Sequence, residues 1–159
     1  MRREKFLWPI THAHHYGLMA AKAIQRKLEE KPAGKDLGKL RRETANFFDA
    51  DMNSHIGLEE EMLGQLACHT SPADPFVEKA RREHRELHGL VKKGDARSLE
   101  LFAEKLIRHI YFEEDKLFPA VEEQFTQSEK EWLETEIQFN IHNWSKTAAF
   151  SRNNPGRKP

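Results

Sequence analysis

Apolar side chains recur every three or four residues along most of this chain, and alternation of apolar with polar positions is scarce. The first spacing gives an α-helix one apolar face, whereas alternation is typical of a half-buried strand. Glycines, prolines and capping residues divide the pattern into five predicted helices, at about residues 11–30, 36–68, 74–93, 95–119 and 128–142. We therefore predict an all-α protein.

Local signals mark several of the predicted helix ends. Thr11 and Asp36 are the expected N-caps of the first two helices, and Gly94 ends the third. Ser128, with Glu131 three residues later, forms a capping box that opens the fifth helix. Because the connections are short, successive helices should run antiparallel.

We expect residues 1–125 to form an antiparallel up-down four-helix bundle. Residues 126–159 then supply an extra C-terminal helix and a flexible tail that flank the same domain. The extra helix is rich in aromatic residues, which favours a structural role in the fold, with a lid or a contact between two copies of the chain as the alternatives.

An internal repeat supports the bundle. The segments 55–63 and 109–117 both read H-I-x-x-E-E-x-x-L, 54 residues apart. A helical hairpin repeated once places equivalent polar groups of its second and fourth helices in the same interior. The repeat therefore bears on chemistry as well as on architecture.

Seven polar residues interrupt the apolar faces of the four bundle helices. They are His14 and three pairs spaced by four residues, His55 with Glu59, His84 with His88, and His109 with Glu113. Side chains four residues apart on a helix are separated by about 40° around the axis and roughly 6 Å along it, so both can reach one small object. Burying them without partners would cost on the order of several kcal/mol, and a shared cation removes that cost.

The donor set indicates which cation. Imidazoles and carboxylates without a thiolate favour a borderline transition metal such as iron, and carboxylates that bridge favour two ions. If Glu59, Glu113 and a solvent-derived oxo or hydroxo group all bridge, one iron ion has six ligands and includes three imidazoles, those of His84, His88 and His109. The other ion has only His14 and His55, which leaves an open position for a diatomic ligand.

Two assignments stay open at this point. His15 would replace His14 if the phase of the first helix were shifted by one residue, and Glu114 is an alternative to Glu113. Three further histidines lie at helix ends or on polar faces and are expected to be exposed: His12, His69 and His142.

Over about residues 8–120 these positions resemble the hemerythrin-type (HHE cation-binding) domain family. The family pattern is a lone His on the first helix, H-x-x-x-E on the second, H-x-x-x-H on the third, and a His followed by a carboxylate on the fourth. Here it is met by the seven residues named above. The resemblance implies a non-haem di-iron centre that binds dioxygen reversibly, or that serves sensing, iron handling, or nitric-oxide and peroxide chemistry.

The chain departs from the oxygen carriers of that family at the last carboxylate. In those proteins an Asp lies five residues after its His, whereas here Glu113 lies four residues after His109 and Glu114 lies five residues after it. The internal repeat favours Glu113, because Glu59 stands four residues after His55.

The composition of the chain excludes several classes of partner and of metal site. Lys and Arg number 26 and are balanced by 26 Asp and Glu, so the charge pattern of a nucleic-acid or anionic-membrane binder is missing. No apolar run approaches the roughly 20 residues that span a bilayer, and a single cysteine excludes Cys-rich zinc and iron-sulfur sites. We expect a cytoplasmic protein with a small-molecule ligand.

Three functions remain. The leading hypothesis is a binding protein, rather than an enzyme, that takes dioxygen or another diatomic molecule for sensing, storage or delivery. The alternative is a di-iron oxidase or peroxidase, or a nitric-oxide or iron-handling protein. The third is a structural bundle whose histidines bind zinc adventitiously.

Overall fold

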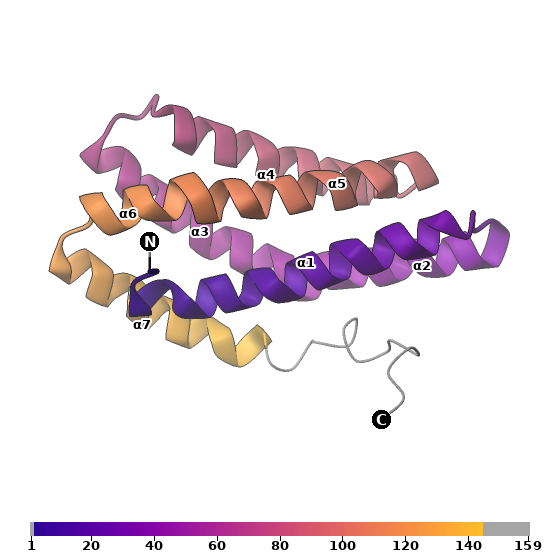
Figure 1. Ribbon diagram of the computed structural model, residues 1–159, viewed down its shortest axis with the longest axis horizontal. Helices are drawn as coiled ribbons and strands as arrows, with labels where there is room; N and C mark the ends of the chain where they lie inside the picture. Colours follow the sequence, from indigo (N-terminus) through magenta and orange to yellow (C-terminus); the bar gives the residue numbers. More distant parts are fainter. Residues whose placement is uncertain (1, 145–159) are drawn as a thin grey trace.

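The computed structural model describes residues 2–144, and every regular element in that range is helical, which confirms the all-α prediction. The elements are η1 (Lys5–Leu7), α1 (Trp8–Glu29), α2 (Gly34–Phe47), η2 (Phe48–Met52), α3 (Asn53–His69), α4 (Pro75–Lys93), α5 (Ala96–Phe112), η3 (Glu113–Leu117), α6 (Phe118–Gln124) and α7 (Gln127–Trp144). These elements form four rods, namely α1, α2 with η2 and α3, α4, and α5 with η3 and α6. Figure 1 shows the rods in antiparallel up-down order, with α7 at the end of the bundle where the chain begins. The predicted tail beyond residue 144 lies outside the described residues.

The first two helices begin a few residues earlier than predicted. The first helix begins at Trp8 rather than near Thr11, with Pro9 inside its first turn, where a missing N–H costs nothing. Asp36 likewise lies within the first turn of α2, whose N-cap is Ala33. In contrast, Gly94 ends α4 as predicted, with a left-handed φ of 66° that suits glycine.

The capping box of the last helix lies two residues earlier than predicted. The backbone N–H of Thr126 donates to the Glu129 carboxylate at 2.8 Å, and the Glu129 N–H donates to Thr126 Oγ1 at 3.3 Å. The pair Ser128 and Glu131 has the same spacing, but Thr126 is the first of the two candidates after the chain leaves α6. It therefore takes the cap, and α7 starts at Gln127.

Two single turns of π-helix interrupt the rods without breaking them. One, η2, joins α2 to α3, and the other, η3, joins α5 to α6. A π turn adds one residue to the local repeat, so side chains after it are displaced around the helix, and such turns occur frequently at functional sites. Here η2 precedes the H-I-x-x-E-E segment of α3, and η3 begins at Glu113 inside the second copy.

The apolar interior consists of two clusters. The first gathers residues such as Ile10, Leu58 and Leu117 toward the α7 end, and the second gathers Ala20, Leu106 and Met52 toward the opposite end. On each of the four rods, a histidine predicted as a ligand is buried near the boundary of the two clusters: His14, His55, His84 and His109. A polar layer therefore crosses the middle of the bundle.

The helix α7 belongs to this interior. Its Leu133 and Ile137 are fully buried in the first cluster, and it packs against α1, α3 and η1. Its outer side leaves Phe139 77% exposed and Trp132 37% exposed. Its proposed role as a self-association surface stays a prediction, which size-exclusion chromatography of a Phe139→Ser variant would test.

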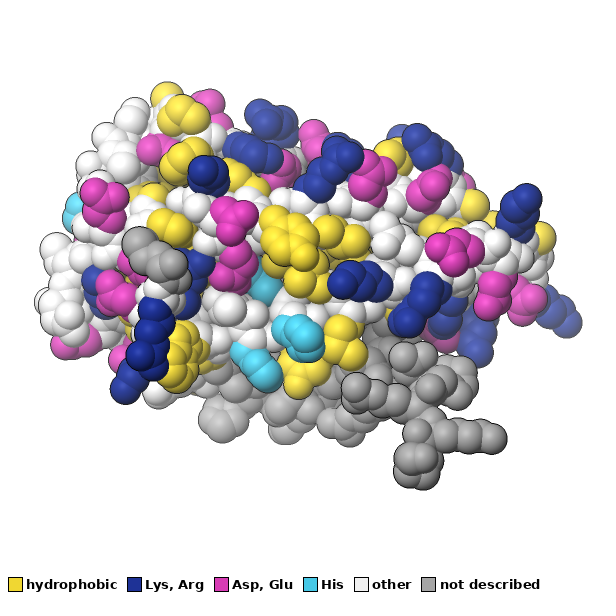
Figure 2. Space-filling model, viewed as in Figure 1, with side chains coloured by type: hydrophobic (Ala, Val, Ile, Leu, Met, Phe, Trp, Pro, Cys, Tyr) yellow, Lys and Arg dark blue, Asp and Glu magenta, His cyan; other side chains and the backbone are white. Residues whose placement is uncertain are grey.

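The surface matches the balanced composition. On the face shown in Figure 2, acidic and basic side chains are interspersed rather than gathered by sign. Within the described residues, none of the helices combines the length and the apolar character that crossing a bilayer requires.

Candidate metal centre

Six buried side chains from all four rods meet in the polar layer. Their potential ligand atoms form two groups, and within each group all of these atoms lie within 4.8 Å of one another. One group is His14, His55, Glu59 and Glu113, and the other is His84, His109, Glu59 and Glu113. Both carboxylates belong to both groups, which is the arrangement that two bridging ligands require.

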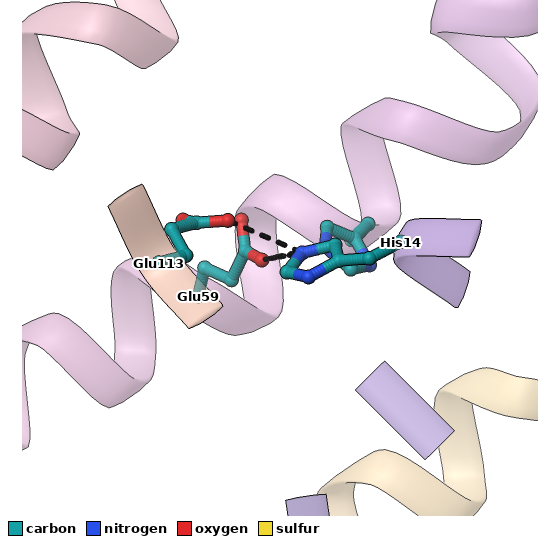
Figure 3. Close-up of side chains that lie close together, drawn as sticks. His14, Glu59 and Glu113 are labelled. Atoms are coloured by element: carbon teal, nitrogen blue, oxygen red, sulfur yellow. Dashed lines mark hydrogen bonds and ion pairs between the residues drawn. The ribbon is translucent and has the colours of Figure 1, made fainter. Parts of the chain in front are cut away.

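In the first group, the His14 side chain of α1 points toward the carboxylates of Glu59 in α3 and Glu113 in η3 (Figure 3). Its Nε2 lies 3.3 Å from Glu59 Oε1 and 3.2 Å from Glu113 Oε2. His55 Nε2 lies 2.5 Å from Glu59 Oε1 and 3.0 Å from His14 Nε2. Two imidazole nitrogens therefore face the same small space from α1 and α3.

The second group repeats this arrangement with α4 and α5. His84 Nε2 lies 3.3 Å from Glu59 Oε2 and 3.7 Å from Glu113 Oε1. His109 Nε2 lies 3.1 Å from Glu113 Oε1. The two groups together offer four imidazole nitrogens and four carboxylate oxygens, all from residues at most 6% exposed.

Several of these atoms lack a hydrogen bond although they are buried. Among the described residues none reaches Glu59 Oε2, either carboxylate oxygen of Glu113, His84 Nε2 or His109 Nε2. Buried polar groups are nearly always satisfied, so orphaned atoms that converge on one point need an explanation. Nitrogen and oxygen donors at this spacing fit a pair of metal cations, which would satisfy all five atoms.

The outer nitrogens of three imidazoles are held by a second set of carboxylates. Glu114 accepts from His14 Nδ1 at 2.7 Å, Glu60 from His84 Nδ1 at 2.6 Å, and Glu83 from His109 Nδ1 at 2.8 Å. An imidazole that donates its Nδ1 proton outward presents the Nε2 lone pair inward, which is the tautomer that binds a metal. These carboxylates therefore orient three of the four imidazoles.

Each outer carboxylate in turn meets a basic side chain. Arg3 pairs with Glu114 at 3.1 Å and Arg81 with Glu60 at 3.1 Å. Lys79 pairs with Glu83. Three sets of contacts thus surround the site, and each runs from a basic side chain through a carboxylate to an imidazole.

The pKa values show how strongly the inner groups are coupled. Burial alone opposes charge on His84, but the close Glu113 and Glu59 carboxylates outweigh it and raise the pKa of His84 to about 11. In the same way burial lowers the pKa of His109, and the charge of the close Glu113 carboxylate, with the hydrogen bond to Glu83, raises it to about 9. Burial would raise the pKa of Glu59, yet His55, His14 and His84 lower it well below its usual range. Metal binding would therefore displace protons from these imidazoles.

The structure does not bring His88 into either group. The predicted inward position of His88 is wrong, because the buried stripe of α4 continues through Leu87 and Val91 and leaves His88 exposed on its flank. There its ring stacks on Phe48, with centroids 5.5 Å apart and planes at 10°. It also lines a surface cavity of about 320 Å³, together with Arg81, Arg85 and the edge of His84.

The two open assignments have clear positions. His14 is buried and His15 exposed, so the predicted phase of the first helix is confirmed. Glu113 belongs to both groups, whereas Glu114 lies outside them and holds His14. The roles of Glu60, Glu83 and Glu114 beside the imidazoles were not predicted from the sequence pattern. The repeat carried a signal for two of them, since each inner Glu is followed directly by an outer one.

A comparison with protein families agrees with this geometry. The model of the hemerythrin HHE cation binding domain matches residues 8–121, a range that contains every residue of both groups. Comparisons with curated proteins and with solved structures give no match.

Proposed function

Because the chain belongs to the hemerythrin HHE cation-binding domain family, we propose that its buried centre holds two iron ions and binds dioxygen or a similar diatomic molecule. The observation that carries the proposal is the convergence of six buried ligands with five orphaned atoms among them. His14 and His55 would hold one ion, and His84 and His109 the other. Glu59 and Glu113 would bind both.

The donor set supports iron. Four imidazoles and two carboxylates suit a borderline transition metal, and the absence of sulfur among these ligands disfavours softer ions. With His88 outside the groups, each ion would be held by two imidazoles and two shared carboxylates, which is fewer than six protein ligands. A reduced iron pair supplies electrons and free coordination positions for a diatomic ligand.

The surroundings favour binding over turnover. Met62 and Leu106 are fully buried beside the polar layer, and the Phe118 ring stacks on His14 with centroids 5.4 Å apart. Apolar walls exclude water and so protect a bound ligand from side reactions with solvent protons. These features support storage, sensing or delivery of the ligand.

The test is anaerobic loading with ferrous iron, followed by metal analysis and optical spectra before oxygen, after oxygen and after its removal. We expect two iron ions per chain and a spectral change that reverses. The His15→Ala variant is the matched control, because His15 is exposed beside His14. Irreversible oxidation would instead support the oxidase alternative, and fewer than one bound ion in wild type would contradict the proposal.

A further inference from the structure

We propose that Arg3 is a positioning residue for the metal centre, so that the segment before α1 forms part of the His14 side of the site. The inference rests on the proposed function, since it concerns how the chain holds a metal ligand. It arises from one continuous set of contacts from Arg3 through Glu114 to His14.

The guanidinium of Arg3 reaches two carboxylates from the end of the bundle. It pairs with Glu114 Oε2 at 3.1 Å and with Glu122 Oε2 at 3.2 Å, and it also donates to the backbone carbonyl of Glu114. A planar guanidinium spreads its five donors over three nitrogens and so reaches these acceptors at once, whereas an ammonium has its three donors on a single nitrogen. Arg3 therefore fixes the position of Glu114 relative to the helical rod that carries it.

Glu114 transmits this position to His14. Its Oε1 accepts from His14 Nδ1 at 2.7 Å, while Oε2 also accepts from Thr11 Oγ1 at 3.1 Å. A second contact links the same residues, because Phe118 meets Arg3 at 5.3 Å from its ring centroid and also stacks on His14. Both paths end at the imidazole whose Nε2 faces Glu59 and Glu113.

The segment that carries Arg3 is itself anchored. The backbone N–H of Glu4 donates to Glu122 Oε1 at 2.8 Å, and Lys130 of α7 pairs with the Glu4 carboxylate at 2.8 Å. Trp8 Nε1 donates to the Arg3 carbonyl at 2.9 Å, and the next turn buries Phe6 and Leu7. Arg3 is thus held in place from both sides, and its side chain is only 17% exposed.

The first test uses metal-free protein with ¹⁵N-labelled histidine and follows exchange of the His14 Nδ1 proton with water by NMR. In Arg3→Ala we expect exchange to be at least about tenfold faster than in wild type, because Glu114 loses its fixed position. The neighbouring variant Arg2→Ala is the control, since Arg2 is exposed. Unchanged exchange in Arg3→Ala would overturn the inference, whether or not the protein binds iron.

The second test measures ferrous iron binding. We expect Arg3→Ala to weaken one of the two ions by about tenfold and to leave the other near its wild-type affinity. The affinity of Arg3→Lys for this ion should lie between those of wild type and Arg3→Ala, because lysine keeps the charge but cannot bridge both carboxylates as the planar guanidinium does. Equal weakening of both ions, or the same loss in Arg2→Ala, would show a general effect on folding and contradict a positioning role. Two ions in wild type with no change in Arg3→Ala would refute this inference and leave the proposed function standing.

Discussion

The imidazoles of His14 and His84 make equivalent contacts, but their outer support is built differently. Each donates Nδ1 to the second Glu of a repeated Glu-Glu pair, Glu114 for His14 and Glu60 for His84. Behind Glu60 stands Arg81, which lies one turn before His84 on the same helix. Behind Glu114 stands Arg3, which is 111 residues away in sequence.

Burial separates the two supports as well. Both members of the Arg81 pair are 37% exposed, whereas Arg3 and Glu114 are 17% and 19% exposed. Exposed ion pairs contribute about 0–1 kcal/mol because water screens them, and less exposed pairs are screened less. The position of Glu60 beside His84 therefore depends little on its ion pair and mainly on the packing of the helices. The position of Glu114 beside His14 depends on the segment that carries Arg3, which is distant in sequence.

The largest expected effect comes from the residues that the two sides share. Glu59→Ala and Glu113→Ala should each lower iron content from two ions to less than one per chain, because each removes a ligand from both groups. Glu61→Ala, at an exposed position of the same helix as Glu59, should keep both ions. Metal analysis after gel filtration decides this, and retention of two ions in Glu113→Ala would contradict the assignment of shared ligands.

A change confined to the His84 side should affect one ion rather than both. His84→Ala should remove or severely weaken one ion, whereas His88→Ala should retain both, because His88 is exposed and stacks on Phe48. The two variants differ by one helical turn and serve as controls for each other. Loss of an ion in His88→Ala would show that the ring turns inward when metal binds, as the sequence pattern predicts.

The outer carboxylates should have smaller and separable effects. Glu60→Gln and Glu114→Gln keep the shape of the side chain but remove its charge, and each should weaken one ion by about 10–100-fold. Competition with a chelator gives both dissociation constants. If the two variants weakened the same ion, the division of the centre into a His14 side and a His84 side would be wrong.

The last prediction concerns the stability of the metal-free protein, which should depend on pH. The pKa of folded His109 is raised to about 9 and that of His84 to about 11, above the usual 6.5. Their stabilisation is complete below about pH 6.5, declines above it, and is lost as pH passes the folded values, because the folded state then binds more protons than the unfolded one. The pKa of Glu59 is lowered, so its contribution disappears as pH falls below about 4.5.

Thermal unfolding followed by circular dichroism between pH 4 and pH 10 measures this profile. We expect the highest melting temperature between about pH 4.5 and 6.5, with a decline on the alkaline side. The His15→Ala control should reproduce the wild-type profile, since His15 is exposed. A melting temperature that stayed constant from pH 6.5 to 9 would show that these imidazoles are neutral in the metal-free fold.

Much of the fold follows from the helical spacing, and the inner ligands follow from the polar residues that interrupt it. His14, Glu59 and Glu113 stand out because a buried charge on an apolar stripe needs a partner. His88 illustrates the limit of the same reasoning, since two neighbouring residues, Leu87 and His88, both lie near the predicted face. Only packing against the other rods decides that Leu87 is buried and His88 is not.

The residues around the inner site, such as Glu60, Glu83 and Arg3, could not be predicted for a different reason. Glu60 and Glu83 lie on half-exposed flanks, where a charged residue is ordinary and carries no signal of its own. Arg3 precedes the helical pattern altogether, and its role depends on a contact with a residue 111 positions later in the sequence. The π turns were hidden because one extra residue in a long helix still fits an average spacing of three to four.

The polar layer also determines how the four rods are aligned lengthwise. Apolar packing alone tolerates many alignments, because one leucine resembles the next. Sliding one rod by a single turn, about 5.4 Å, would move its imidazole against an apolar cluster and leave the facing carboxylates without a partner. Each buried polar group left in that state costs about 1–3 kcal/mol. The residues proposed to hold the metal thus also set the longitudinal register of the bundle, and they do so without any metal.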